Sequence, residues 1–201
     1  MRFFSNYVWR FSIQKKEIFL TFDDGPTKEI TDFVLDELKK YNAKATFFCI
    51  GKNIENHSKT FNRILKEKHS IGNHTQNHLN GWKTNTETYL NNVLKCEDTI
   101  FSEIRKNNSK LFRPPYGKIK KRQAKALRKK GYSIIMWDVL SADFDTSISK
   151  EKCLKNVLAN TKKGSIIVLH DSVKASEKVK FILPELLEYF TKKGFKFKAI
   201  A

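Results

Sequence analysis

Short apolar runs alternate with longer amphipathic segments along most of this 201-residue chain, and this alternation limits the possible folds more than any other feature of the sequence. The runs at residues 132–140 and 165–171 are nearly continuously apolar, which is typical of strands buried on both faces. Between such runs, apolar residues recur at helical spacing, for example at Ile30, Val34 and Leu38. Strands that alternate with helices predict a parallel sheet in an α/β fold.

About seven strand–helix units fit into the chain, which favours a closed, deformed (β/α)7 TIM-like barrel over an open doubly wound sheet. Because the chain is 40% hydrophobic and has no low-complexity stretch, we expect a single domain over residues 1–201. Residues 1–16 would form a short N-terminal extension. In either architecture, functional residues gather where the strands end.

The composition is strongly basic, with a formal net charge of +18. This charge favours association with an anionic cell-wall polymer or a membrane surface, although a lysine-rich composition also covers ordinary solvated faces. The basic residues are scattered, and no zinc-finger or RNA-binding motif occurs. We therefore expect no nucleic-acid partner, and we expect a monomer.

Three widely spaced cysteines, Cys49, Cys96 and Cys153, predict buried thiols rather than a disulfide framework. The N-terminal stretch has neither a signal-peptide pattern nor a run long enough to cross a membrane, which favours a cytoplasmic location. We expect the apolar residues of this stretch to pack against the domain rather than to seek a surface. They are Phe3, Phe4, Tyr7, Val8 and Trp9.

Polar and ionisable side chains follow five successive strands of the expected sheet. One such group could arise by chance, but five groups at the same edge indicate a functional site. The adjacent carboxylates after the first strand repel one another, so we expect a cation near them. The groups are Asp23 and Asp24, His74 and His78, Arg113 and Tyr116, Asp138 and Asp143, and His170 and Asp171.

His74 and His78 have a spacing that places two imidazoles on one side of a helical turn, within reach of one divalent metal ion. Two surface histidines are the alternative for this spacing taken alone. The spacing does not decide whether Asp23 or Asp24 completes the site, because neighbouring strand residues point to opposite faces. Only the Gly-Pro break that follows would let both face one cavity, where the second aspartate would act as a base.

Two prolines precede Tyr116, so its backbone N–H is the first free donor of the segment "RPPYG". This donor suits an oxyanion hole, and a simple structural turn is the alternative. Arg113 would pair with the base carboxylate. His170 ends a buried strand and would act as a general acid, oriented by Asp143 or Asp138.

In their order and approximate spacing, "TFDDGP", "HTQNH", "RPPYG", "WDVLSADF" and "LHD" resemble the five motifs of the polysaccharide deacetylases, the NodB-homology, family 4 carbohydrate esterases. The resemblance covers nearly the whole chain. It implies a deformed (β/α) barrel that uses a divalent metal ion, usually Zn2+ with Co2+, Ni2+ or Mn2+ as alternatives, to remove acetyl groups from a glycan. It also implies a location in the cell envelope or secretion.

The resemblance further implies a role for each matched residue. Asp23 would be the general base, tuned by Arg113. His170 would be the general acid, with Asp143 as its partner, and Thr75 would stabilise the histidine loop. The metal ligands would be Asp24, His74 and His78. The substrate would contact Tyr116, Pro115, Leu169, Trp137 and Phe144, with Leu169 lining the pocket for the acetyl methyl group.

The fourth motif departs from the usual family pattern of Asp-x-x-Asp-Trp, because Leu140 replaces the first acid and Phe144 replaces the tryptophan. Phe144 keeps an apolar wall but lacks the indole N–H, and Trp137 would supply some of the lost bulk. Because Asp143 is kept, we expect an active enzyme. An amine leaves only when it is protonated, so the acid His170 favours removal of N-acetyl groups from N-acetylglucosamine in chitin or peptidoglycan. The alternatives are an O-acetyl esterase acting on acetylxylan and a non-catalytic carbohydrate-binding domain.

Overall fold

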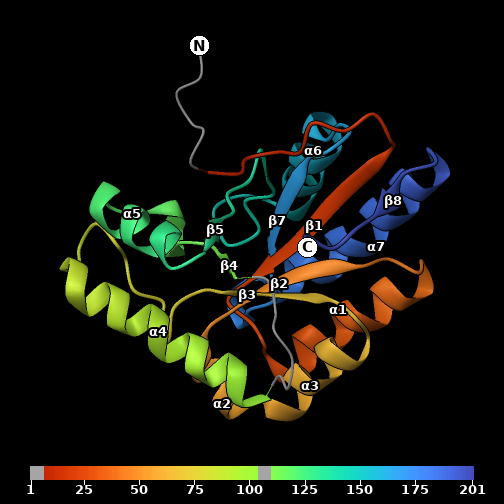
Figure 1. The fold of residues 1–201 in the computed structure, drawn as a ribbon. Helices are drawn as coiled ribbons and strands as arrows, with labels where there is room; N and C mark the ends of the chain where they lie inside the picture. The colour runs from red at the N-terminus through yellow and green to blue at the C-terminus, as the bar shows by residue number, and fades with distance from the viewer. Residues whose placement is uncertain (1–6, 104–109) are drawn as a thin grey trace.

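The computed structural model describes residues 7–103 and 110–201, in which parallel strands form one sheet that curls into an incomplete barrel (Figure 1). Hydrogen-bonded neighbours follow the order β5-β4-β3-β2-β1-β7-β6, and β8 pairs with the start of β1. This order runs round the sheet in sequence, so the predicted deformed TIM-like barrel is confirmed. The barrel is not closed as expected, because β5 and β6 do not pair and leave a gap. The strands are β1 (Glu17–Asp23), β2 (Ala45–Cys49), β3 (Ser70–Asn73), β4 (Leu111–Phe112), β5 (Ser133–Ile134), β6 (Val139–Leu140), β7 (Ile166–His170) and β8 (Lys196–Phe197).

The α-helices lie around the outside of the strands (Figure 1). Two short 3-10 turns, at Pro115–Gly117 and Val173–Ala175, come after β4 and β7. None of the described helices has the length and apolarity that a membrane crossing requires. The helices are α1 (Lys28–Lys40), α2 (Gly51–Asn56), α3 (Ser58–Lys66), α4 (Thr86–Glu103), α5 (Lys121–Lys129), α6 (Lys150–Asn160) and α7 (Ser176–Lys192).

Side chains of β1 alternate between the helical layer and the barrel interior, and this alternation positions the functional end. Ile18, Leu20 and Phe22 are fully buried in the large core that also contains residues of α1 and α7. Each such side chain stabilises the fold by about 1.5–3 kcal/mol through burial. Thr21 and Asp23 occupy the alternate positions, so they point into the barrel.

The described part of the N-terminal extension bridges the gap in the barrel. The backbone N–H of Val8 donates to the carbonyl of Ile134, and the N–H of Phe11 donates to the carbonyl of Gly164, which precedes β7. The prediction that this stretch packs against the domain is confirmed for Tyr7 and Val8, which contact buried core residues. Trp9 is 38% exposed, and Phe3 and Phe4 lie outside the described residues.

The structure corrects one expected strand and confirms the expected state of the cysteines. The apolar run at residues 132–140 forms two short strands, β5 and β6, because the backbone between them turns to pair with the N-terminal extension, where Met136 N–H donates to Val8 O. The three cysteines are free and buried, as predicted. Pro184 lies in the middle of α7, which begins at Ser176.

Candidate active site

A cavity opens where the strands end, and it is lined by residues that lie on or follow six strands, β1, β3, β4, β5, β6 and β7. The sequence motifs supply most of these side chains, so the fold brings together the groups that the sequence places far apart. The lining residues are Asp23, Asp24, His74, His78, Tyr116, Lys118, Trp137, Leu140, Phe144, Val168, His170 and Lys174.

Asp24, His74 and His78 form a cluster in which one ligand atom from each residue lies within 4.8 Å of the others. Asp24 Oδ1 is 3.1 Å from His78 Nε2 and 3.6 Å from His74 Nε2. The two histidines lie on a loop rather than on the predicted helical turn, because Thr75 and His78 adopt positive φ angles of 66° and 54°. Thr75 Oγ1 accepts a hydrogen bond from Leu79 N–H across this loop, which agrees with its implied stabilising role.

The protonation of this cluster suits a cation. His74 Nδ1 donates to the carbonyl of Arg113 at 2.8 Å, which leaves the lone pair of Nε2 directed to the Asp24 side. Burial lowers the pKa of His74 to about 4, so this imidazole is neutral at pH 7. Burial by itself would raise the pKa of Asp24, but contact with His78 and the charges of the nearby histidines lower it to about 2. Asp24 Oδ1 is buried and accepts no hydrogen bond within the described chain.

Asp23 is held by a buried arginine, as the sequence predicts. Arg113 Nη1 donates to Asp23 Oδ1 at 2.7 Å and to Thr21 Oγ1 at 2.6 Å. The other guanidinium nitrogens donate to the carbonyls of Ile135 and Met136. Arg113 is fully buried, and these bonds fix its planar fork. One oxygen of Asp23 is therefore fixed in place, while the side chain lines the cavity.

His170 lies at the end of β7, on the side of β1 opposite to β2 and β3, and it is bound to the carboxylate of Asp143. Its Nδ1–H donates to Asp143 Oδ1 at 2.7 Å, its backbone N–H donates to Asp143 Oδ2 at 2.7 Å, and Ser141 adds a bond to Oδ1. Burial alone would lower the pKa of His170, but the bond to Asp143 and the charge of that carboxylate raise it to about 9. Asp138, the alternative partner, instead accepts from Ile166 N–H at the opposite end of β7.

Tyr116 lies at the cavity edge with a φ angle of 60°, and its ring centroid is 4.6 Å from that of His78. Within the described part of the chain, the backbone N–H groups of Gly117 and Lys118 donate to the carbonyls of Pro114 and Pro115, whereas the Tyr116 N–H has no carbonyl acceptor. Pro115 was expected to contact the substrate, but it is buried and does not line the cavity, whereas Trp137 does. The amide of Tyr116 is therefore free to bind a developing negative charge.

The apolar wall of the cavity also differs from the sequence expectation at Leu169. Phe144 lines the cavity and contacts the ring of His170 edge-on, with centroids 5.2 Å apart. Leu169 was expected in the acetyl pocket, but it is buried in the core that faces the helices. Because side chains alternate along β7, Val168 and His170 face the cavity and Leu169 faces away. Leu140, the other departure from the family pattern, is 40% exposed at the cavity.

Sequence reasoning assigned no role to Asp171, which is fully buried behind the site. Its carboxylate accepts from Gly25 N–H at 3.0 Å and from the hydroxyl of Thr31 at 2.5 Å. A Cβ atom at Gly25 would lie 2.0 Å from this carboxylate, so glycine is needed there. Burial raises the pKa of Asp171 to about 7. Asp171 thus ties the loop that carries Asp24 to the strand that carries His170.

Comparison with known proteins agrees with this arrangement. Residues 12–135 match the family profile described as "Polysaccharide deacetylase". Two Bacillus cereus proteins named peptidoglycan-N-acetylglucosamine deacetylase are 40% identical over 83% of this chain and 34% identical over 98% of it. The chain spans 60% of the first relative's length and 92% of the second's.

Among solved structures, a peptidoglycan N-acetylglucosamine deacetylase in complex with 4-naphthalen-1-yl-N-oxidanyl-benzamide superposes with a TM-score of 0.91. It is 34% identical to this chain, and the alignment covers 97% of this chain and 91% of that one. The likeness therefore extends over the whole barrel, including the part beyond the family profile that carries Asp143 and His170.

Proposed function

The chain belongs to the polysaccharide deacetylase family, and from this premise we propose that it is a metal-dependent hydrolase that removes N-acetyl groups from N-acetylglucosamine residues of a glycan. Peptidoglycan is the first candidate substrate, because the relatives named above carry it in their names. Chitin-type oligomers are the second. The products would be acetate and a glycan with a free amino group.

One observation carries the proposal. A possible metal site, an arginine-bound aspartate and a carboxylate-bound histidine line the same cavity at the ends of β1, β3 and β7. A carbohydrate-binding module without catalysis needs none of these paired groups. Their convergence supports hydrolysis, in which a base, an acid and an electrophile must act on one bond.

Asp24, His74 and His78 are suited to hold a divalent ion. The buried Asp24 Oδ1 without a hydrogen-bond donor, next to the unprotonated Nε2 of His74, is the kind of donor set that zinc prefers. A bound ion would polarise the acetyl carbonyl and lower the pKa of water. We propose Zn2+ as the native metal, with Co2+, Ni2+ or Mn2+ as alternatives, because the ligand types do not exclude them.

The remaining residues would move protons and stabilise charge. Asp23, oriented by Arg113, would accept a proton from water as the water oxygen bonds to the acetyl carbon. The Tyr116 N–H would donate to the former carbonyl oxygen as that oxygen becomes negative. His170, with Nδ1 bound to Asp143, would donate its Nε2 proton to the nitrogen as the carbon–nitrogen bond breaks.

The proposal is tested by an acetate-release screen on peptidoglycan, N-acetylglucosamine oligomers and acetylxylan. The protein is first stripped with a chelator, and Zn2+, Co2+, Ni2+ or Mn2+ is then added back separately. We expect acetate from the N-acetylated glycans only after metal is restored. Release from acetylxylan alone would assign the O-acetyl esterase activity, and release from none of the glycans would leave a binding domain.

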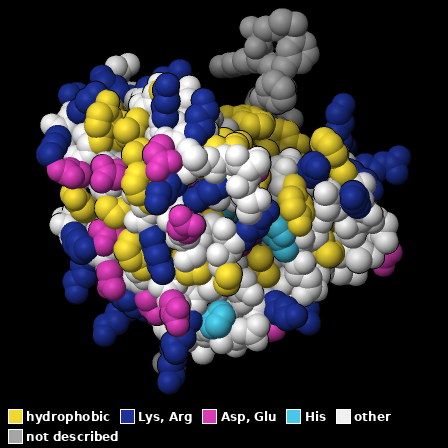
Figure 2. All heavy atoms as spheres, turned by 180° about the vertical axis from the view of Figure 1, so that it is seen from behind, with side chains coloured by type: hydrophobic (Ala, Val, Ile, Leu, Met, Phe, Trp, Pro, Cys, Tyr) yellow, Lys and Arg dark blue, Asp and Glu magenta, His cyan; other side chains and the backbone are white. Residues whose placement is uncertain are grey.

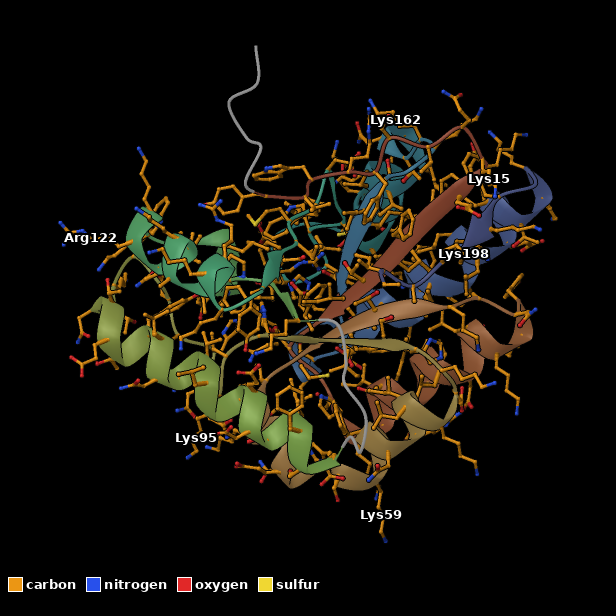
Figure 3. All side chains as sticks on the ribbon, viewed as in Figure 1. Lys15, Lys59, Lys95, Arg122, Lys162 and Lys198 are labelled. Carbon is orange, nitrogen blue, oxygen red and sulfur yellow. The ribbon has the colours of Figure 1, made fainter. Side chains whose placement is uncertain are left out.

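We also propose that the basic surface assists the approach to an anionic cell-wall polymer. Lysine and arginine side chains lie around the whole outline of the face in Figure 2, whereas acidic side chains gather mainly toward one side. Turnover on peptidoglycan is then expected to fall with ionic strength, while turnover on a short neutral oligomer is not. The basic side chains labelled in Figure 3 are exposed and come from three helices and three connecting segments; they are Lys15, Lys59, Lys95, Arg122, Lys162 and Lys198.

A further inference from the structure

An exposed tryptophan, Trp82, contacts Lys118, which lines the cavity. Trp82 is 61% exposed and follows shortly after His78 in the chain. A single exposed aromatic residue is ordinary on a protein surface, so its surroundings decide whether it has a role. Three other large hydrophobic side chains that are exposed, those of Tyr116, Leu140 and Phe144, line the cavity that Lys118 also lines.

The loop that carries Trp82 is fixed to the segment that leads into α5. The fully buried Gln123 donates from Nε2 to the carbonyl of Gly81 at 3.0 Å and to that of Thr84 at 3.3 Å. Gly81 N–H donates to the carbonyl of Lys118 at 3.1 Å. A Cβ atom at Gly81 would lie 2.4 Å from that oxygen, so the two segments approach more closely than a residue with a side chain permits.

The indole is also anchored directly. Its Nε1–H donates to the carbonyl of Ile119 at 3.3 Å, and the backbone N–H of Trp82 donates to Asn80 Oδ1 at 3.0 Å. Lys118 Nζ lies 5.4 Å from the ring centroid. An exposed ring that is already held in place offers a flat apolar surface at low entropic cost, which suits stacking on the apolar face of a sugar ring.

Lys118 connects this surface to the reaction cavity, which it lines together with Asp23 and His170. Among the residues that the structure describes, no carboxylate forms an ion pair with its ammonium group, and its recorded side-chain partner is the Trp82 ring. The charge is therefore free to meet a negative group on a ligand. An ammonium beside an apolar ring fits a sugar that carries a carboxylate.

We propose that Trp82 and Lys118 form a second sugar subsite, in which the indole stacks on the sugar next to the one that is deacetylated and the ammonium binds a carboxylate of that sugar. The inference rests on the proposed function and names its substrate class as a glycan in which an acidic sugar neighbours the N-acetylated one. N-acetylglucosamine alternating with muramic acid has this property, whereas chitin is neutral.

Two tetrasaccharides of equal length test the subsite: one alternates N-acetylglucosamine with N-acetylmuramic acid, and the other contains N-acetylglucosamine alone. Calorimetry gives Kd and acetate release gives kcat and KM. Trp82→Ala is expected to weaken binding of both by about tenfold, mainly through KM, and Trp82→Tyr to restore most of the affinity.

The charge is tested by Lys118→Gln, which is expected to reduce the preference for the acidic tetrasaccharide by about two- to fivefold. High salt should abolish this difference between wild type and variant. Lys95→Gln is the matched control, because Lys95 points outward from α4, and it should match the wild type on both substrates (Figure 3).

Unchanged affinity for both tetrasaccharides in a natively folded Trp82→Ala protein would overturn the subsite. An equal loss on the acidic and the neutral substrate in Lys118→Gln would overturn the carboxylate assignment. If the wild type released no acetate from either substrate while Trp82→Ala still weakened binding, the proposed function would fail and the subsite would stand.

Discussion

His74 and His170 line the same cavity from different strands, yet their surroundings shift the pKa of each imidazole in opposite directions. We call Asp24, His74 and His78 the metal side, and Asp143 and His170 the acid side. On the metal side, the pKa of His74 falls to about 4, and on the acid side the pKa of His170 rises to about 9. Near pH 7 one imidazole is therefore neutral and the other is protonated.

The difference lies in what each Nδ1–H meets. His74 is buried and His170 is mostly buried, and for each imidazole the removal from water by itself lowers the pKa. His74 donates to a neutral backbone carbonyl, that of Arg113, which does not overcome this effect. His170 donates to the carboxylate of Asp143, which does. One partner atom thus separates a residue suited to bind a cation from one suited to give away a proton.

The largest effect is expected from His74→Ala, which removes an imidazole from the metal side. We expect the purified protein to retain little zinc and acetate release to fall by more than about a hundredfold, because a lost ligand costs more than a lost neighbour of a ligand. Metal analysis and an acetate assay measure both. His57→Ala, at a histidine with no assigned role, should keep wild-type zinc content and acetate release. Normal turnover by metal-free His74→Ala protein would contradict the proposed role of the metal side in catalysis.

His170→Ala should separate the acid side from the metal side. We expect kcat to fall by about 10²–10⁴-fold, since the departing amine loses its proton donor, while zinc content stays at the wild-type level. Asp23→Asn should behave in the same way through loss of the base. Kinetics with metal analysis decide the matter, and loss of zinc from His170→Ala would show that the two sides are not independent.

Asp143→Asn should sharpen the comparison through pH. Because the pKa of His170 is raised to about 9, its proton is present below that pH and is lost as pH rises through it. Asparagine keeps an acceptor but removes the charge, so the alkaline limb of kcat/KM is expected to move to lower pH. A profile between about pH 5 and pH 10 measures this shift. Asp145→Asn is the control, and an unmoved limb in Asp143→Asn would exclude His170 as the acid.

The smallest effect on turnover is expected at Asp171, which links the two sides. Asp171→Ala leaves Gly25 N–H and the Thr31 hydroxyl without their acceptor, so the free energy of unfolding should fall by about 1–3 kcal/mol. Turnover should fall by less than about tenfold, through looser placement of Asp24. Urea unfolding and zinc titration test this, and Asp171→Asn should lose less. An Asp171→Ala protein as stable as the wild type would show that Asp171 does not link the two sides.

Much of the fold could be predicted from the sequence because the signals are repeated. The apolar runs of β1, β2 and β7 predict parallel strands that are buried on both faces. The polar residues that follow these strands then lie together at one edge of the sheet. The run at residues 132–140 misled because hydrophobicity reports burial but not the direction of the backbone. There the chain bends between β5 and β6 to pair with the N-terminal extension.

The site was predictable in composition but not in local geometry. His74 and His78 meet through positive φ angles at Thr75 and His78, which their spacing alone does not indicate. Strand alternation, applied strictly from His170, would have placed Val168 rather than Leu169 in the cavity. The proposed role of Trp82 could not be predicted from the sequence, because the indole is positioned by a hydrogen bond to Ile119, which is distant in the sequence.

The gap between β5 and β6 has a consequence for how the molecule is made. The residues that bridge it, Val8 and Phe11, pair with Ile134 and Gly164, which a ribosome produces much later. During synthesis, this segment cannot form these pairings until most of the ring has emerged. Such long-separated pairings slow assembly, so closure of the ring belongs to the final stage of folding.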